Sequence, residues 1–359
     1  MITTSIWIFG CMENRNGDEP ITTVLQGKAL GTTWTVKILS KNEIKKEELR
    51  DDIGRKLEEG DKIFSHWRKD SNLYQFNAAL TTTPLSVLPP LLDLLEHAEW
   101  INRQSEGAFD PTLAPVINLW GFGPVGETRS TIPTGKQILE AKKLTGMDKF
   151  KVLPKGFIQK TLPGLQLDFS GSAKGEIIDQ VCTLLQRWNF NNFLVELGGE
   201  VRAHGKGRNG KGWIIGLEDG SGDSESMVAV PLRNYSVATS GTYQLNKPNP
   251  DANRSASHLL DPRTGRPIEH ELIAVNAFAP TARDAEKFAF TPLVKSHKTS
   301  KKNNGKRSII PSLPIDECFF GLLVQQLFLL PTRGGFHNTL GHRHTGHGCS
   351  GYPFDFFLS

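Results

Sequence analysis

Hydrophobic and polar residues repeat with two different periods along this chain, and each period predicts a different kind of element. Apolar positions spaced three and four residues apart predict amphipathic helices over residues 41–64, 85–107, 134–147 and 175–190. Alternating apolar and polar residues over 22–39 predict a half-buried pair of strands. Shorter strands are predicted over residues 192–199, 200–207, 212–219, 226–234, 235–241 and 271–280. The pattern therefore predicts a mixed α/β (α+β) protein, with a largely antiparallel sheet core flanked by helices.

The pattern fades toward both ends, which divides the chain into three parts. Residues 1–20 are an apolar segment and a polar linker, residues 21–294 carry the predicted elements, and residues 295–359 are basic and then rich in Gly and His. This last part holds eight Lys or Arg against three Asp or Glu, a charge of +5, so the rest of a chain of formal charge +4 carries about −1. A nucleic-acid surface would spread basic residues over the folded part. Nucleic acid is therefore not an expected partner.

The final segment concentrates side chains that often bind metals. His337, His342, His344, His347 and Cys349 follow one another within a Gly-rich stretch. Their spacing matches no metal site with a physical rationale, and the surrounding composition favours a flexible tail.

Cysteine use and the first residues bear on where the protein works. The four cysteines form no CxxC pair, which argues against a zinc ribbon or a dithiol redox centre. Cys182 lies in an apolar helical stretch and is predicted to be buried. Cys11 ends the segment IWIFGC, which is similar to the end of a bacterial lipoprotein signal, although Phe9 is bulky and no basic region precedes it. A lipidated Cys11 and a frayed N-terminus both stay open.

The stretch LDFSGSAKGEIID, residues 167–179, has the composition of an anion-binding loop. Its small residues let the backbone approach a ligand, and the helix that follows offers free N–H groups and a positive dipole end. Lys174 adds a charge suited to phosphate. Asp168, at the end of a predicted apolar strand, is placed to accept a hydrogen bond from a ligand amine or imide. The alternative is a tight strand-to-helix turn with Lys174 in solvent.

A second candidate lies in SEGAFDPTLAPVINLWGFGP, residues 105–124. Asp110 precedes a proline, which holds its backbone extended and fixes the direction of its carboxylate. Trp120 and Phe122 stand beside glycines and are able to bracket a flat ring. For Trp120 an ordinary core position is the favoured interpretation.

Two glycine-rich strand ends and a histidine complete the candidates. Gly198 and Gly199 end one predicted strand, where the backbone has to pass close to a neighbour, and ATSGTY ends another. In SHLLDPRTGRP, His258 lies near Asp261 and is a candidate base. A histidine paired with the backbone of a turn is the alternative.

These stretches also carry a family resemblance. GTTWTV, SHWRKDSNLYQFN, GAFDPT with WGFGP, LDFSGSAKG, LVELGGEVRAHG, ATSGTY and SHLLDPRTGRP occur in the order that marks the ApbE family of flavin transferases. The motifs span roughly residues 22–291, about three quarters of the chain. The chain is thus similar to proteins that cleave FAD and pass FMN to the hydroxyl of a threonine or serine in an acceptor protein, with release of AMP and a requirement for Mg²⁺.

The resemblance assigns roles residue by residue. It implies His258 as the base that activates the acceptor hydroxyl. It implies FAD contacts at eight positions, which are Leu30, Trp67, Ala108, Phe109, Asp110, Asp168, Lys174 and Leu260. It implies magnesium ligands at the carbonyl of Gly171 and within AEKFAF, residues 285–290, through Glu286 and Ala289. The loop at 167–179 would then face the phosphates of FAD.

The metal motif departs from the family pattern Ala-Asp-Ala-Leu-Ala-Thr. Glu286 replaces the aspartate, which keeps a carboxylate on a longer arm, and Phe290 replaces the threonine, which removes an oxygen ligand. Beyond Thr291 no family pattern continues. An FAD pyrophosphatase and a non-catalytic FAD-binding lipoprotein are therefore the alternatives to the transferase.

The resemblance also bears on partners and location. It implies an exported protein on the periplasmic side of the bacterial inner membrane, with a lipid anchor at Cys11 as one option. The expected acceptor is a flavoprotein with a target Thr or Ser, most naturally a membrane redox subunit.

Overall fold

A computed structural model describes residues 19–124, 132–217, 228–241, 246–247, 256–268 and 274–295. These residues all fall within one compact unit, Met1–Leu329. Cys11 and the Gly- and His-rich tail lie outside the described residues, so the expectations for them stay predictions. The same holds for the side chain of Phe290 and for Thr242 and Tyr243 of ATSGTY.

A six-stranded antiparallel sheet forms the centre of the fold, as the sequence predicts. Its strand order is β1-β2-β6-β7-β10-β15. The strands are β1 (Ile21–Ala29), β2 (Thr32–Ser40), β6 (Phe193–Leu197), β7 (Glu200–His204), β10 (Ser236–Gly241) and β15 (Ala274–Ala279). The predicted strand pair over 22–39 is the β1–β2 hairpin, whose turn uses Leu30 and Gly31 at φ of 51° and 72°.

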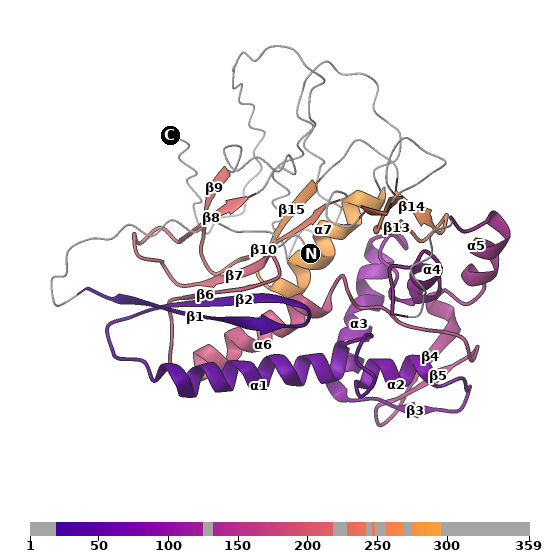
Figure 1. Ribbon diagram of the computed structural model, residues 1–359, viewed down its shortest axis with the longest axis horizontal. Helices are drawn as coiled ribbons and strands as arrows, with labels where there is room; N and C mark the ends of the chain where they lie inside the picture. Colours follow the sequence, from indigo (N-terminus) through magenta and orange to yellow (C-terminus); the bar gives the residue numbers. More distant parts are fainter. Residues whose placement is uncertain are drawn as a thin grey trace, which may run out of the picture. The chain divides into compact units, whose positions relative to one another are not determined.

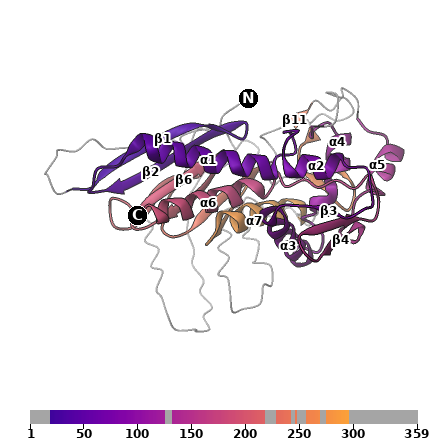
Figure 2. The ribbon, with the colours of Figure 1, turned by 90° about the horizontal axis from the view of Figure 1, so that it is seen from below.

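Three helices lie side by side over one face of this sheet (Figures 1 and 2). They are α1 (Lys46–Phe64), α6 (Ala173–Arg187) and α7 (Ala282–Lys295). In α1 the apolar stripe Leu49, Ile53 and Leu57 is buried, while the charged residues between these positions face away. Burial of Cys182 in α6 is confirmed, and it raises the pKa of that thiol. Each helix is thus held in place by its apolar side.

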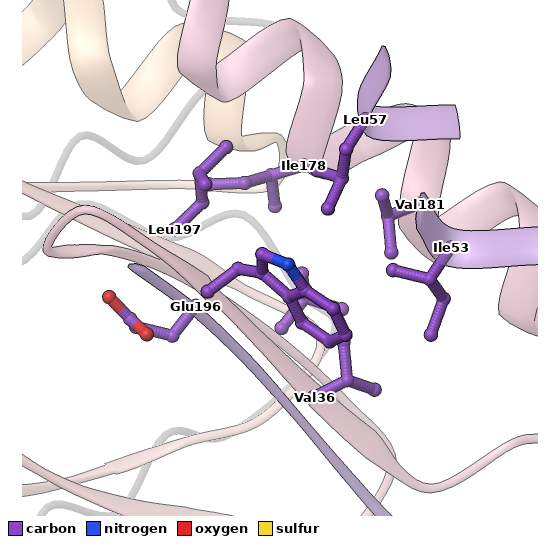
Figure 3. Close-up of a pocket in the computed structure, with 9 residues that line it drawn as sticks. Val36, Ile53, Leu57, Ile178, Val181, Glu196 and Leu197 are labelled. Atoms are coloured by element: carbon purple, nitrogen blue, oxygen red, sulfur yellow. The ribbon is translucent and has the colours of Figure 1, made fainter. Parts of the chain in front are cut away.

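Figure 3 shows this helix–sheet core from within. Leu57 of α1 and Ile178 and Val181 of α6 point toward Val36 of β2. The gap between them is an apolar cavity of about 10 Å³, which is too small to bind a ligand. Glu196 of β6 points its carboxylate away from Ile178 and Leu57, toward the other face of the sheet.

A hairpin covers that other face. It consists of β8 (Trp213–Leu217) and β9 (Val228–Leu232), and its apolar side packs on the sheet through a second core cluster that includes Leu194, Val201 and Phe278. Gly198 turns β6 into β7 so close to Thr32 that an added Cβ would lie 3.0 Å from the Cγ2 of that residue. The close backbone passage predicted for this glycine is therefore made against the protein itself.

The remaining described elements lie outside the central sheet, its three helices and the covering hairpin. They are α2 (Asn72–Ala78), α3 (Pro89–Gln104), the 3₁₀ turn Pro111–Leu113, α4 (Ala114–Leu119), α5 (Gly135–Lys142), the 3₁₀ turn Met147–Lys149, a sheet of β3 (Leu85–Ser86), β5 (Phe157–Lys160) and β4 (Phe150–Leu153), and the pairs β11 (Asn246–Lys247) with β12 (Ala256–Ser257) and β13 (Leu260–Asp261) with β14 (Arg266–Pro267). No helix among the described residues is both long and apolar enough to span a bilayer.

All four predicted helices begin later or end earlier than the sequence pattern suggests. The helix expected over 41–64 begins at Lys46, and the one expected over 175–190 ends at Arg187. The helix expected over 85–107 starts only at Pro89, because Leu85 and Ser86 pair with β5 instead. The helix expected over 134–147 ends at Lys142, and Thr134 caps it with a complete capping box. Thr134 therefore marks where this helix begins.

Candidate functional site

The loop 167–172 enters α6 without the strand that the sequence predicts before it. No strand is formed over 165–169, and hydrogen bonds from a side chain and a neighbouring loop hold this segment instead. The amide of Asn77 both donates to the Leu167 carbonyl and accepts from the Leu167 N–H, each at 2.8 Å. The Asp168 N–H donates to the Pro111 carbonyl at 2.7 Å. The expectation of a strand here was wrong, because one side-chain amide replaces the partner strand.

Asp168 is buried, and its two oxygens face different groups. Oδ1 accepts the N–H of Ser170 at 2.7 Å and also bonds the Ser170 hydroxyl. Oδ2 lies 4.0 Å from Nε2 of His66. Next to His66, the Trp67 side chain is 62% exposed, and its ring is tilted against the imidazole with centroids 5.4 Å apart. A carboxylate, an imidazole and an exposed indole therefore meet at this edge of the loop.

A small polar cavity of about 50 Å³ opens beside this carboxylate. It lies between α2, α4 and the loop before α6, and its lining includes His66, Tyr74, Asn118, Gln166 and Asp168. The Asn118 amide donates to the Gln166 side-chain oxygen at 2.9 Å, so part of this wall is already fixed by internal hydrogen bonds.

Lys174, on the first turn of α6, joins two carboxylates from distant parts of the chain. Its ammonium forms an ion pair and hydrogen bond with Oε1 of Glu200, at the start of β7. It also lies 3.9 Å from Oε1 of Glu286 on α7. The other oxygen of Glu286 accepts the N–H of Gly175 at 2.8 Å. We call Lys174, Glu200 and Glu286 the carboxylate–lysine cluster.

Burial dominates the electrostatics of this cluster. Burial, and then the neighbouring Glu200 carboxylate, raise the pKa of Glu286 to about 8. Burial likewise raises the pKa of Glu200, against the pull of Lys174. Burial alone would lower the pKa of Lys174, but Glu200 and Glu286 outweigh it and raise that pKa. One ammonium therefore pairs with two carboxyl groups, and Glu286 holds a proton up to a higher pH than an exposed glutamate does.

Two oxygens of the cluster have no hydrogen-bond partner among the described residues. They are Oε2 of Glu200 and Oε1 of Glu286, and both are fully shielded from solvent. Hard, anionic oxygens of this kind are suited to Mg²⁺. Within the described residues, no group of three or more His, Cys, Asp or Glu is arranged around a single metal position.

Close packing fixes where α7 presents Glu286. An added Cβ at Gly175 would lie 2.5 Å from the Ala282 carbonyl oxygen, so only glycine permits this approach of α6 and α7. Asp179 of α6 accepts the N–H groups of Ala282 and Arg283 at 2.9 and 3.1 Å and so caps the start of α7. The carboxylate motif is therefore anchored to the same helix that carries Lys174.

The GAFD stretch is held by its own hydrogen bonds. Oδ1 of Asp110 accepts the N–H and the hydroxyl of Thr112 at 2.8 and 2.6 Å, and burial raises the pKa of this carboxyl. Phe109 is buried in the main core, and its ring lies next to Gly171, where an added Cβ would be 3.8 Å from Cε2. Ala108 packs in a separate small cluster with Leu259 and three other residues.

His258 lies between the short strands β12 and β13. Its half-buried ring meets the Phe122 ring edge-on, with centroids 6.4 Å apart. Asp261, considered from the sequence as its neighbour, binds the Arg263 guanidinium through both oxygens, at 2.9 and 2.8 Å. Trp120 is buried and donates Nε1–H to the Gly265 carbonyl at 2.8 Å, so the core interpretation favoured for it is confirmed.

Not all of the predicted residues are brought into one contact network. Lys174 and Glu286 meet, and Gly171 adjoins Phe109, whereas Leu30 packs on the main core from the β1–β2 turn. Leu260 is buried with Trp120 and Leu113, and Ala289 is fully buried inside α7. For these three positions the described contacts are with the protein core.

Comparison with known proteins shows which family this chain belongs to. The family model described as "ApbE family" matches residues 30–306, well over half of the chain. The chain belongs to the ApbE family. The match begins at Leu30 and includes α7, so the helix with Glu286 and Ala289 lies inside the family region. It continues to residue 306, so the expectation that no family pattern continues beyond Thr291 was wrong.

Relatives of known name lie close in sequence. The FAD:protein FMN transferase of Haemophilus influenzae is 35% identical over 292 residues, which cover 78% of this chain and 84% of the relative. That of Klebsiella pneumoniae is 32% identical over 292 residues, covering 80% and 83%.

Solved ApbE structures share the fold. The flavin transferase ApbE of Vibrio cholerae superimposes with a TM-score of 0.69 at 32% identity, over 77% of this chain and 87% of that one. The apo flavinyl transferase ApbE of Pseudomonas stutzeri gives 0.70 at 32% identity, over 77% and 85%. The mixed fold with an antiparallel sheet is thereby confirmed as an ApbE fold.

Two residues of this ApbE site were not singled out from the sequence. Glu200 lies inside the quoted motif LVELGGEVRAHG, but only its glycines drew attention. His66 precedes Trp67 in SHW and was likewise passed over. Each is a charged or titratable residue directly beside a predicted ligand contact or a glycine turn, and this position was the signal in the sequence that could have found it.

Proposed function

We propose that this ApbE protein is a magnesium-dependent FAD:protein FMN transferase. The observation that carries the proposal is the joining of Lys174, in the loop expected to face phosphate, with Glu286, in the expected metal motif, within the family region. The names of the relatives support the same activity. The reaction would form a phosphoester between FMN and an acceptor threonine or serine and release AMP.

The chemistry asks the protein mainly to position charged oxygens. The acceptor hydroxyl gives its proton to a base, its oxygen bonds to the phosphorus on the riboflavin side of FAD, and the pyrophosphate bond to AMP breaks. Lys174 is suited to hold a phosphate oxygen, because its ammonium is charged and side-chain exposure of 31% leaves it accessible. Asp168, Trp67 and the GAFD stretch are the proposed contacts for the remainder of FAD.

His258 is the proposed base. It is half-buried, it lies on the segment directly before β13, and its ring is steadied by Phe122. An imidazole in this setting is suited to take a proton from an approaching hydroxyl near neutral pH.

The residues present fit magnesium on the chemistry of their donors. Glu286 offers a buried carboxylate oxygen without a hydrogen-bond partner among the described residues, and the carbonyls of Gly171 and Ala289 are the further proposed ligands. When bound, the cation would neutralise charge on the pyrophosphate. Since Phe290 has no side-chain oxygen, more of the coordination falls to waters, to FAD or to another protein group.

The acceptor and the location are proposed on sequence alone. A membrane redox subunit with a target Thr or Ser is the acceptor class that suits an exported ApbE protein. Export to the periplasmic side of the inner membrane, with lipid at Cys11, is supported by the segment IWIFGC.

The test is an incubation of the purified chain with FAD, Mg²⁺ and an acceptor domain, read by intact mass. The expected result is an acceptor mass gain of FMN less one water, with stoichiometric AMP, and its loss with EDTA. His258→Ala should lower the transfer rate by at least about a hundredfold. His204→Ala, which changes the histidine at the opposite end of β7 from Glu200, is the matched control and should retain transfer.

The possible outcomes separate the transferase from its alternatives. AMP released without a mass gain on any acceptor would replace transfer by FAD hydrolysis. FAD retained without AMP would leave a flavin-binding protein and refute the proposal.

A further inference from the structure

The carboxylate–lysine cluster holds two buried carboxylate oxygens without a hydrogen-bond partner among the described residues, one from Glu286 and one from Glu200. Each of its two carboxylates uses one oxygen in a hydrogen bond: Glu200 binds Lys174, and Glu286 binds the Gly175 N–H. Each keeps the other oxygen buried and without a hydrogen-bond partner among the described residues. An unpaired buried carboxylate oxygen is costly, so a group that meets both oxygens is the expected complement.

The two carboxylates lie at one place, although they come from different elements. Glu200 starts β7 and Glu286 lies on α7, and both are within ion-pair distance of the same Lys174 nitrogen. Glu200 and Glu286 are only 6% and 4% exposed, so bulk water does not reach these two oxygens. Because both carboxylates lie beside the same ammonium, a small cation held by Glu286 would have the Glu200 carboxylate close by.

We propose that Glu200 is an additional ligand of the divalent cation that Glu286 binds, and that it replaces the hydroxyl oxygen lost at Phe290. Magnesium sites commonly use one or two carboxylates, with waters and substrate phosphates completing the octahedron. Glu200 would hold the cation through Oε2, the oxygen that its hydrogen bond with Lys174 leaves free. The inference rests on the proposed function for the identity of the cation, but its test needs neither FAD nor an acceptor.

Glu196 provides a matched control in the same hairpin. It lies on β6, four residues before Glu200, but points to the opposite face of the sheet (Figure 3). There it accepts the N–H of Gly199 at 3.0 Å. A neutral glutamine at 196 removes a buried charge that acts on Lys174 and Glu200 only through space, so it controls for a general loss of negative charge near the cluster.

The test titrates Mn²⁺ into the metal-free full chain and follows free Mn²⁺ by electron paramagnetic resonance. Glu200→Gln should weaken Mn²⁺ binding by at least about tenfold, and Glu196→Gln should change it less than about twofold. Glu200→Asp, which keeps the charge on a shorter arm, should fall between wild type and Glu200→Gln. Far-UV circular dichroism and thermal melts verify that each variant is folded.

A double variant separates a ligand from a residue that merely holds Lys174. Removing the competing ammonium with Lys174→Met should strengthen Mn²⁺ binding, and adding Glu200→Gln in that background should still weaken it. Equal Mn²⁺ affinity with and without Glu200, in both backgrounds, overturns the inference. A chain that transfers FMN while its Glu200→Gln variant binds Mn²⁺ normally refutes this inference alone. A chain that binds Mn²⁺ through Glu200 but transfers no FMN refutes the proposed function alone.

Discussion

Two lysines of this fold, Lys160 and Lys174, differ in whether a carboxylate lies beside the ammonium. Lys160, the last residue of β5, is 1% exposed, and its ammonium donates to the Ala79 carbonyl at 2.9 Å and lies 4.6 Å from the centre of the Phe76 ring. No carboxylate of the described residues pairs with it, and burial lowers its pKa to about 8. Lys174 faces two carboxylates, and its pKa is raised.

The difference indicates which lysine is built for chemistry. The α2–β5 region tolerates an ammonium by giving it a carbonyl and an aromatic face, which satisfy it without attracting an anion. The α6–α7 region places two carboxyl groups beside Lys174 and leaves one oxygen of each without a hydrogen-bond partner among the described residues, which makes these oxygens available to a cation. The same side chain is therefore a structural element in one region and a candidate binding group in the other.

The largest expected effect comes from Lys174→Met. This change leaves two buried carboxylates without their counter-charge, so we expect a loss of about 2–4 kcal/mol in the unfolding free energy at pH 8 without metal. Lys160→Met should cost far less, because no carboxylate depends on Lys160. Urea denaturation of both variants measures the contrast, and saturating Mg²⁺ should restore part of the loss only for Lys174→Met. Equal losses would remove the distinction between the two regions.

Glu286 should make stability depend on pH in a defined window. Its pKa is about 8 in the fold against a usual value of 4.5, so between these values the folded state binds more protons than the unfolded chain. Metal-free stability should therefore fall as pH rises from about 5 to 8, by on the order of a few kcal/mol. Glu286→Gln should flatten this slope in denaturation curves recorded with EDTA. An unchanged slope would show that Glu286 does not titrate there.

Lys160 should act in the opposite direction and at higher pH. Its folded pKa of about 8 lies below the usual 10.5, so the unfolded chain binds more protons between these values and stability rises with pH there. Lys160→Met should reduce that rise by about 1–3 kcal/mol. The difference in urea midpoint between wild type and variant, followed from pH 8 to 10.5, measures it. A constant difference would contradict the assigned titration.

The smallest expected effect compares two helix caps, that of α7 in the α6–α7 region and that of α5 outside both regions. Asp179→Ala removes the cap of α7 and should cost about 1–2 kcal/mol, while Asp179→Asn should recover most of it because an amide oxygen also caps. Thr134→Ala removes the capping box of α5 and should cost about 1 kcal/mol or less. Only the Asp179 variant should also weaken Mn²⁺ binding, because α7 positions Glu286. Equal effects on the metal would show that α7 is positioned by packing alone.

Local pattern was enough for much of the fold. The stripe Leu49, Ile53 and Leu57 predicts α1, the alternation over 22–39 predicts the first hairpin, and Thr134 marks a helix start. The helix α7 was not predicted, since Pro292 falls in its last turn and residues 285–290 drew attention only as a motif. The strand before Asp168 was wrongly predicted, because the Asn77 side chain that replaces its partner strand comes from 90 residues away.

The sequence by itself determined the periodicity of the elements, the order of the family motifs and the residue types available for chemistry. Only the tertiary structure decided that Lys174 meets Glu200 and Glu286, and that Glu196 faces the other side of the sheet. The reason is physical. A period of two or 3.6 residues is set by local backbone geometry, whereas the field at a carboxylate depends on burial and on charges brought in from distant parts of the chain.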